Sequence, residues 1–182
     1  MSVRDTESGY SWLSILLHWI TAVTVIILWL IAEAAEDAAK EQEASLMGLH
    51  VSIAMTLYLV LWARIFWRLS VKRPALAPQQ PFLGLLARWV PVILLLGIAL
   101  MLVSGPLMIW SGGHDIKVFD LVTLPSPMSK SKPLHEVMEE VHELGANLLY
   151  FGVILHVLGG LKHFVINRDG TLMKILIPGN KP

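Results

Sequence analysis

Residues 135–163 read HEVMEEVHELGANLLYFGVILHVLGGLKH, and this stretch decides the fold that we expect. It reads as one helix in which His142 and His156 are 14 residues apart. At the rise and twist of an α-helix, that spacing is roughly 21 Å along the axis and returns to within about 40° of the same face. One helix thus presents two histidines to one side, near opposite edges of a bilayer core.

The composition indicates a membrane protein. The chain has 182 residues, of which 55% are hydrophobic, and its mean hydropathy is +0.63, above the values of soluble proteins. It contains no cysteine, which excludes disulfides, thiolate metal sites, iron–sulfur clusters and covalent c-type haem attachment. The formal net charge of zero argues against nucleic acid as a partner.

The apolar runs predict an all-α fold, an integral membrane four-helix bundle that forms a single domain over residues 1–182. Residues 12–32 are uncharged over 21 positions, the length needed to cross ~30 Å of hydrocarbon. Residues 1–11 lack the basic region and cleavage site of a secretory signal, so we expect this run to be retained. No internal repeat indicates the inverted halves of a transporter. The predicted spans are about 12–32, 46–67, 83–110 and 134–166.

The distribution of charge predicts the orientation, because lysine and arginine are enriched in cytoplasmic loops. Segment 33–45 holds five acidic residues and one lysine, and we read it as a solvated outer loop. We expect both termini in the cytoplasm, with the long loop 111–134 also outside. The basic residues that support this are Arg64, Arg68, Lys72, Arg73 and Arg88 around the linker after the second span, and Lys162, Arg168, Lys174 and Lys181 near the C-terminus.

This topology sorts four histidines into two levels. His18 and His156 fall in the inner half of the bilayer, on the first and fourth spans. His50 and His142 fall in the outer half, on the second and fourth spans. Each level therefore receives one histidine from each of two helices.

Two imidazoles from two helices are the ligand set of a low-spin haem b. A lone histidine in a membrane helix is often a buried polar group bonded to a neighbouring helix, or part of a proton path. A zinc or copper site would need three or four ligands at one level, whereas these divide two and two. We therefore expect two haem b groups, held by His18, His50, His142 and His156.

Several segments carry a family resemblance. The runs YSWLSILLHW at 10–19, LHVSIA at 49–54 and HELGANLLYFGVILH at 142–156 resemble the bacterial cytochrome b561 family, in particular its small four-helix members of the superoxide oxidase type. The resemblance implies two haems b on the four histidines, electron exchange with ubiquinone near the inner haem, and oxidation of superoxide at the outer surface. Some relatives have histidines at the start of the third span, where this chain has Ala87 and Val90, so no role is carried over from those positions.

Further site residues follow from these expectations on the inner side. Arg64 is deep for a charged residue, and it either reaches a propionate of the inner haem or extends toward the headgroups. His163 matches a family histidine, and it either lines the quinone site or lies at the interface. Its expected companion at the quinone site is Trp12, Ser14 or Lys162.

On the outer side, Lys117, Lys130 and Lys132 are candidates to attract superoxide, an anion. The acidic segment 33–45 opposes them, and the alternative is that they are ordinary solvated charges. His114 and His135 lie in or beside the same loop, where we expect both to be solvated.

Two functions follow. The first is a superoxide:ubiquinone oxidoreductase, a multi-pass protein of the bacterial inner membrane. The second is an electron-transfer subunit that serves a separate dehydrogenase or hydrogenase as redox partner protein, a role held by longer relatives. The short chain favours the first. A histidine-based proton or metal transporter is a third, weaker reading.

Overall fold

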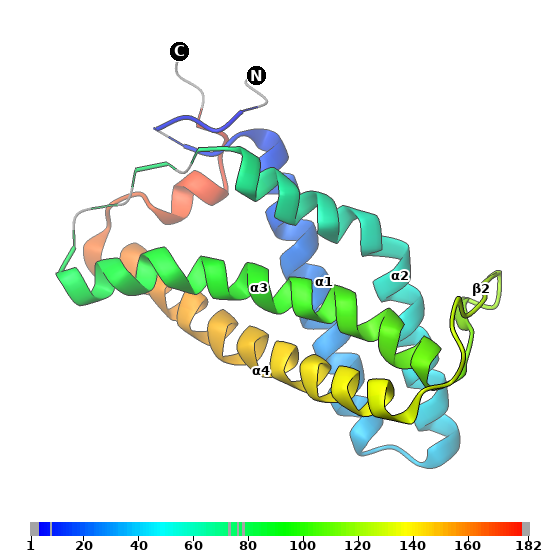
Figure 1. The fold of residues 1–182 in the computed structure, drawn as a ribbon. Coiled ribbons are helices and arrows are strands. Elements are labelled where there is room, and N and C mark those ends of the chain that lie inside the picture. The colour runs from blue at the N-terminus through cyan, green and yellow to red at the C-terminus, as the bar shows by residue number, and fades with distance from the viewer. Residues whose placement is uncertain (1–3, 8, 73, 76, 78, 180–182) are drawn as a thin grey trace.

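The computed structural model describes residues 4–7, 9–72, 74–75, 77 and 79–179, so Arg73 and Lys181 lie outside the described residues. Four long helices dominate the chain, and each is long and apolar enough to cross a membrane (Figure 1). The elements are α1 (Trp12–Glu36), α2 (Lys40–Ser70), α3 (Pro81–Ser111), β1 (Ile116–Val118), β2 (Val122–Leu124), α4 (Lys132–Lys162), the π-helical turn η1 (His163–Asn167) and the 3₁₀ turn η2 (Leu172–Ile175).

The all-α membrane bundle is confirmed, and its helices extend beyond the predicted spans. The acidic segment 33–45 was predicted as a loop, but most of it is helical, and only residues 37–39 separate α1 from α2. Alanine and glutamate are strong helix formers, so the helices continue after the apolar run ends. Hydropathy therefore predicted the four membrane helices but not the residues at which they end.

Helix α3 is continuous although it contains two prolines. Pro91 and Pro106 both lie inside it. Proline is tolerated in membrane helices because neighbouring helices and Ser or Thr side chains satisfy the backbone groups it leaves unpaired. The hydroxyl of Ser104 donates to the carbonyl of Leu100 at 2.7 Å, one turn earlier in the same helix.

A short antiparallel hairpin in the outer loop was not predicted. β1 pairs with β2, with Lys117 opposite Thr123, and the turn between them holds Phe119 and Asp120 at positive φ. The backbone N–H of Phe119 donates to Ser52 Oγ on α2 at 2.8 Å, which attaches the hairpin to the bundle. Strands of three residues are too short to leave a periodic signal in a sequence.

The bundle consists of two helix pairs. α3 packs closely along α4, and α1 packs along α2, while contacts between the pairs are far fewer. Small residues permit the close approach of α3 and α4: a Cβ on Gly97 would lie 2.9 Å from Leu149 Cγ, and one on Gly145 would lie 2.8 Å from Met101 Sδ. The buried core that joins the pairs consists of Leu61, Ile65, Ile98, Leu102 and Leu149.

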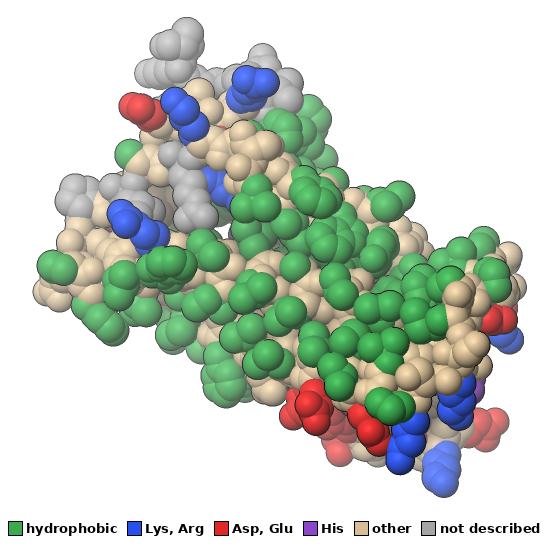
Figure 2. All heavy atoms as spheres, in the orientation of Figure 1, with side chains coloured by type: hydrophobic (Ala, Val, Ile, Leu, Met, Phe, Trp, Pro, Cys, Tyr) green, Lys and Arg blue, Asp and Glu red, His purple; other side chains and the backbone are tan. Residues whose placement is uncertain are grey.

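The two ends of the bundle are distinct. The N-terminal segment, the linker after α2 and the C-terminal segment lie together at one end, whereas the hairpin and the α1–α2 connection lie toward the other (Figure 1). Hydrogen bonds join the three segments: Ala75 N–H donates to Glu7 O at 3.2 Å, and Gly179 N–H donates to Tyr10 O at 3.0 Å. Charged side chains gather at both ends of an apolar surface (Figure 2), as expected for a membrane-spanning bundle.

Candidate functional site

His18 on α1 and His156 on α4 are neighbours that come from two different helices. We call them the inner pair, after the predicted orientation. Their ring centroids are 6.0 Å apart, and the ring planes differ by 56°. An imidazole nitrogen binds a transition metal at about 2 Å. With the half-width of each ring added, two imidazoles on opposite sides of one metal ion have centroids roughly 6 Å apart. The geometry of the inner pair thus fits bis-histidine ligation of a haem iron.

A basic group lies beside the inner pair. Arg64 on α2 is near enough to influence the charge of both His18 and His156. One helical turn further along α2, Arg68 forms an ion pair with the buried Asp5 at 3.0 Å. Asp5 also accepts a hydrogen bond from the backbone N–H of Ser11, next to the start of α1. The inner pair therefore lies beside one arginine, Arg64, and Arg68 and Asp5 are charged neighbours of Arg64.

His50 on α2 and His142 on α4 form the second level, the outer pair, and His50 is close enough to influence the charge of His142. His50 Nδ1–H donates to the carbonyl of Leu28 on α1 at 3.0 Å. His142 Nδ1 lies 2.9 Å from Ser104 Oγ on α3. When Nδ1 carries the proton, Nε2 keeps its lone pair for a metal. The carbonyl of Leu28 thus holds His50 in the tautomer that can bind iron through Nε2.

Within the described residues, no group of three or more His, Cys, Asp or Glu side chains converges as a metal site. A zinc or copper centre of the usual kind needs three or four such ligands. Pairs of imidazoles from different helices suit a planar macrocycle, whose own four nitrogens complete the coordination of the iron.

Beyond the inner pair, α4 ends in the π-helical turn η1, a feature often found at functional sites. His163 Nδ1 and Asp169 Oδ2 are 2.6 Å apart, and Lys162 Nζ donates to Asn167 Oδ1 at 3.1 Å. Hydrogen bonds from Thr171 and from His163 hold the pKa of the Asp169 carboxyl well below its usual range.

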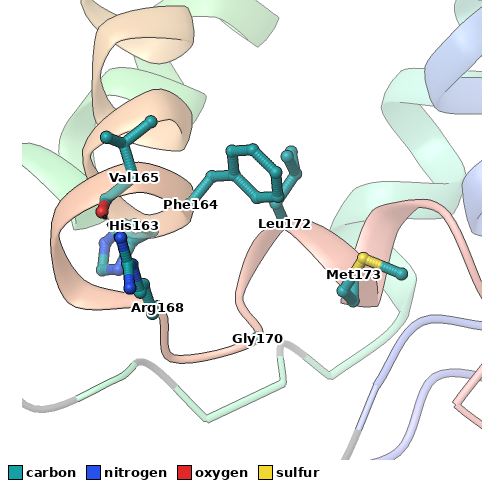
Figure 3. A pocket seen from close by; sticks show the side chains of 7 residues that line it. All are labelled: His163, Phe164, Val165, Arg168, Gly170, Leu172 and Met173. Atoms are coloured by element: carbon teal, nitrogen blue, oxygen red, sulfur yellow. Dashed lines mark hydrogen bonds between the residues drawn. The ribbon is translucent and has the colours of Figure 1, made fainter.

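His163 opens onto a pocket of about 530 Å³ between η1 and η2 (Figure 3). A neighbouring pocket of about 520 Å³ includes Lys162 and Asp169. The indole N–H of Trp19, next in sequence to His18, donates to the carbonyl of Ile175 at 3.0 Å and ties this region to α1. The first pocket is lined by His163, Phe164, Val165, Arg168, Gly170, Leu172 and Met173.

The two other residues expected beside the quinone line neither of these pockets. Trp12 begins α1 with 41% of its surface exposed. Ser14 is buried and accepts a hydrogen bond from the indole of Trp67 at 2.7 Å, so it joins α1 to α2. This hydrogen bond gives Trp67 a role in helix packing.

The three outer lysines are exposed. Lys117 is in β1, Lys130 precedes α4, and Lys132 pairs with Glu136 at 3.3 Å. The expectation that His135 is solvated was wrong: it is partly buried, and its Nδ1 donates to the carbonyl of Met108 at 2.8 Å. α4 folds back on α3 here, which brings the two residues together.

Sequence reasoning did not identify three of the groups around these sites. These are Ser104, Asp5 and Asp169. Their partners are His142, Arg68 and His163. A polar residue in a long apolar span is a signal that would have drawn attention to Ser104; the two aspartates lie in polar segments and carry no such signal.

Comparison with known proteins connects these features to a family. The model of the prokaryotic cytochrome b561 family matches residues 9–178. The chain belongs to this family. It is therefore a multi-pass bacterial membrane cytochrome of the b type, and haem b is the cofactor that the family implies.

Individual relatives are similar over nearly their whole length. The chain is 29% identical to the probable superoxide oxidase CybB of Yersinia pestis, over 92% of this chain and 95% of the relative. It is 26% identical to cytochrome b561 homolog 2 of Escherichia coli, over 97% and 95% of the two chains. It is also 26% identical to cytochrome b561 homolog 1 of the same organism, over 92% and 96%.

Proposed function

We propose that this cytochrome carries two haems b in one transmembrane domain, oxidises superoxide at the outer face of the bacterial inner membrane and reduces ubiquinone at the inner face. The observation that carries the proposal is the arrangement of four histidines as two pairs at two levels of the bundle. The inner pair has ring centroids 6.0 Å apart, and the outer pair is held by hydrogen bonds. Both termini are cytoplasmic in this proposal.

Haem b bound at each level would take up and release one electron at a time. The four histidines would hold the two haems, and hydrogen bonds to Leu28 and Ser104 orient the two imidazoles of the outer level. Arg64 is placed to pair with a propionate of an inner haem, because it approaches both inner histidines from α2.

The end of α4 is the proposed quinone site. Reduction of ubiquinone to the quinol needs two electrons and two protons, so the site must combine an apolar lining with proton donors. The pocket beside η1 offers His163 next to Phe164, Leu172 and Met173. Lys162 faces the adjoining pocket. His163 lies seven residues beyond His156, about 10 Å along the helix axis.

Superoxide is proposed as donor because one relative is named a probable superoxide oxidase. Each superoxide anion would lose one electron and leave as dioxygen, so two anions balance one ubiquinone. Lys117, Lys130 and Lys132 lie at the outer end and would attract the anion. Their effect is reduced where acidic side chains are close, as Glu136 is to Lys132.

The decisive experiment is to purify the protein, count its haems by absorbance, and mix it with superoxide and a soluble ubiquinone. We expect a reduced b-type spectrum with two haems per chain and formation of quinol in the ratio of one per two superoxide anions. A dihaem spectrum without reduction by superoxide would favour the electron-transfer subunit, and copurification of a dehydrogenase or hydrogenase would identify its partner.

A further inference from the structure

Ser104 is the polar side chain of α3 that contacts the outer pair. It is fully buried, with 0% of its surface exposed, at a level where the helix is surrounded by apolar residues. Its Oγ lies 2.7 Å from the carbonyl oxygen of Leu100 and 2.9 Å from His142 Nδ1. A buried hydroxyl with two partners at these distances is part of a defined hydrogen-bond chain.

Counting protons determines the direction of this chain. A serine hydroxyl has one proton, and the carbonyl of Leu100 is able only to accept, so the Ser104 proton points toward Leu100. The Ser104 oxygen is then an acceptor toward His142. His142 must therefore donate from Nδ1–H, which leaves the lone pair on Nε2 directed away from α3.

From this chain we propose that Ser104 is a positioning residue for the outer ligand: it selects the Nε2-binding tautomer of His142 and makes that nitrogen a stronger donor to iron. The inference rests on the proposed ligand role of His142. Hydrogen bonding from the far nitrogen of a metal-bound histidine fixes the ring and raises its basicity. A more basic axial ligand favours the ferric state, and hydrogen bonding around the ligand is one of the means by which proteins set haem potentials.

The two histidines of the outer pair have hydrogen-bond acceptors of different kinds, a backbone carbonyl and a side-chain hydroxyl. His50 donates to the carbonyl of Leu28, an acceptor that no substitution removes. His142 depends on a hydroxyl that one substitution removes. Ser104 is consequently a position at which one substitution tests the outer site without changing either histidine.

The test is a redox titration of the intact haem-loaded protein carrying Ser104→Ala, Ser104→Cys or Ser104→Thr. The outer haem is identified as the one that His142→Ala removes. We expect the ratio of reduced to oxidised outer haem at a fixed ambient potential to rise about fivefold in Ser104→Ala, less in Ser104→Cys, and hardly at all in Ser104→Thr, which keeps the hydroxyl. The electron paramagnetic resonance signal of the ferric outer haem should shift in the same order.

Thr24→Val is the matched control. Thr24 is also buried in a membrane helix, and its hydroxyl donates to the carbonyl of Ile20 at 2.7 Å, the same bond that Ser104 makes to Leu100. Its removal should leave the outer potential unchanged, since no histidine bond accompanies it among the contacts described for this residue.

An outer potential in Ser104→Ala equal to that of the wild type, with both haems bound, would overturn the inference and leave the proposed function intact. If Ser104→Ala loses the outer haem, the comparison of Cys with Thr decides, and equal potentials in these two variants would likewise overturn it. A wild-type protein that binds no haem at the His142 level would instead refute the ligand assignment on which the inference rests.

Discussion

The outer and inner histidine pairs occupy the same bundle but have different surroundings. Both outer imidazoles donate from Nδ1 to an oxygen acceptor, Leu28 O for His50 and Ser104 Oγ for His142. No such acceptor contacts His18 or His156 among the residues that the structure describes, and the cation of Arg64 lies beside them instead. Haems bound at the two pairs, as we propose, would therefore differ in their affinity for an electron although both would be held by two histidines.

The physical consequence is a direction for electron flow. If each pair binds a haem as we propose, hydrogen-bond acceptors on the outer histidines would favour the oxidised state of the outer haem, whereas the nearby cation would favour the reduced state of the inner haem, which carries less positive charge. Both effects would then make electron transfer from the outer to the inner level favourable. The proposed reaction, from superoxide outside to ubiquinone inside, needs that direction.

The largest expected effect is the loss of one haem from one level while the other level keeps its haem. His50→Ala or His142→Ala should remove one haem per chain from the outer level, and His18→Ala or His156→Ala one from the inner level, because a single imidazole does not hold a bis-histidine haem. The absorbance of the purified variants gives the number of haems per chain. Full two-haem content in any of the four would break the assignment, and each variant should also melt at a lower temperature than the wild type.

A second expected effect concerns the inner end alone. Replacing His163 by Asn and Lys162 by Gln should slow reduction of ubiquinone about tenfold or more, because both candidate proton donors to the quinone are lost. Reduction of the outer haem should keep its rate. Lys174→Gln, a charge change in the same C-terminal segment but in neither pocket, is the control. Unchanged quinone kinetics in the double variant would place the quinone elsewhere.

A third prediction concerns the effect of Arg64 on the midpoint potentials of the two haems. Arg64→Gln should lower the midpoint potential of the inner haem by about 60 mV, equivalent to about tenfold in a one-electron equilibrium, because a half-buried cation is screened less than an exposed one. The outer potential should move much less. Lys40→Gln removes an exposed cation at the opposite end and should change neither potential. Equal shifts of both haems in Arg64→Gln would contradict a local effect.

The smallest effect is expected from the outer lysines. Stopped-flow reduction of the outer haem by superoxide should fall severalfold with added salt in the wild type, since attraction of an anion by exposed charge is screened beyond ~8 Å at physiological ionic strength. The triple variant Lys117→Gln, Lys130→Gln, Lys132→Gln should be slower and less sensitive to salt. Identical salt curves for the two proteins would show that these lysines are ordinary solvated charges.

Local patterns were sufficient for much of this protein. Four apolar runs predicted four membrane helices, and the charges in the connecting segments predicted which loops share an end. The spacing of His142 and His156 on one helix predicted two levels, and His18 does lie beside His156. These features depend on helix period and hydropathy, which act over a few residues and can be read from the chain directly.

The remaining features depend on contacts between distant segments. The bond from His142 to Ser104 spans 38 positions, that from His50 to Leu28 spans 22, and that from Trp67 to Ser14 spans 53. No local sequence pattern indicates that the hairpin binds Ser52, or that α3 continues through Pro106. Helix period and hydropathy were enough to predict the four membrane helices and the histidines that they carry. Which oxygen an imidazole meets depends on how the helices pack, because the donor and the acceptor come from segments far apart in the chain.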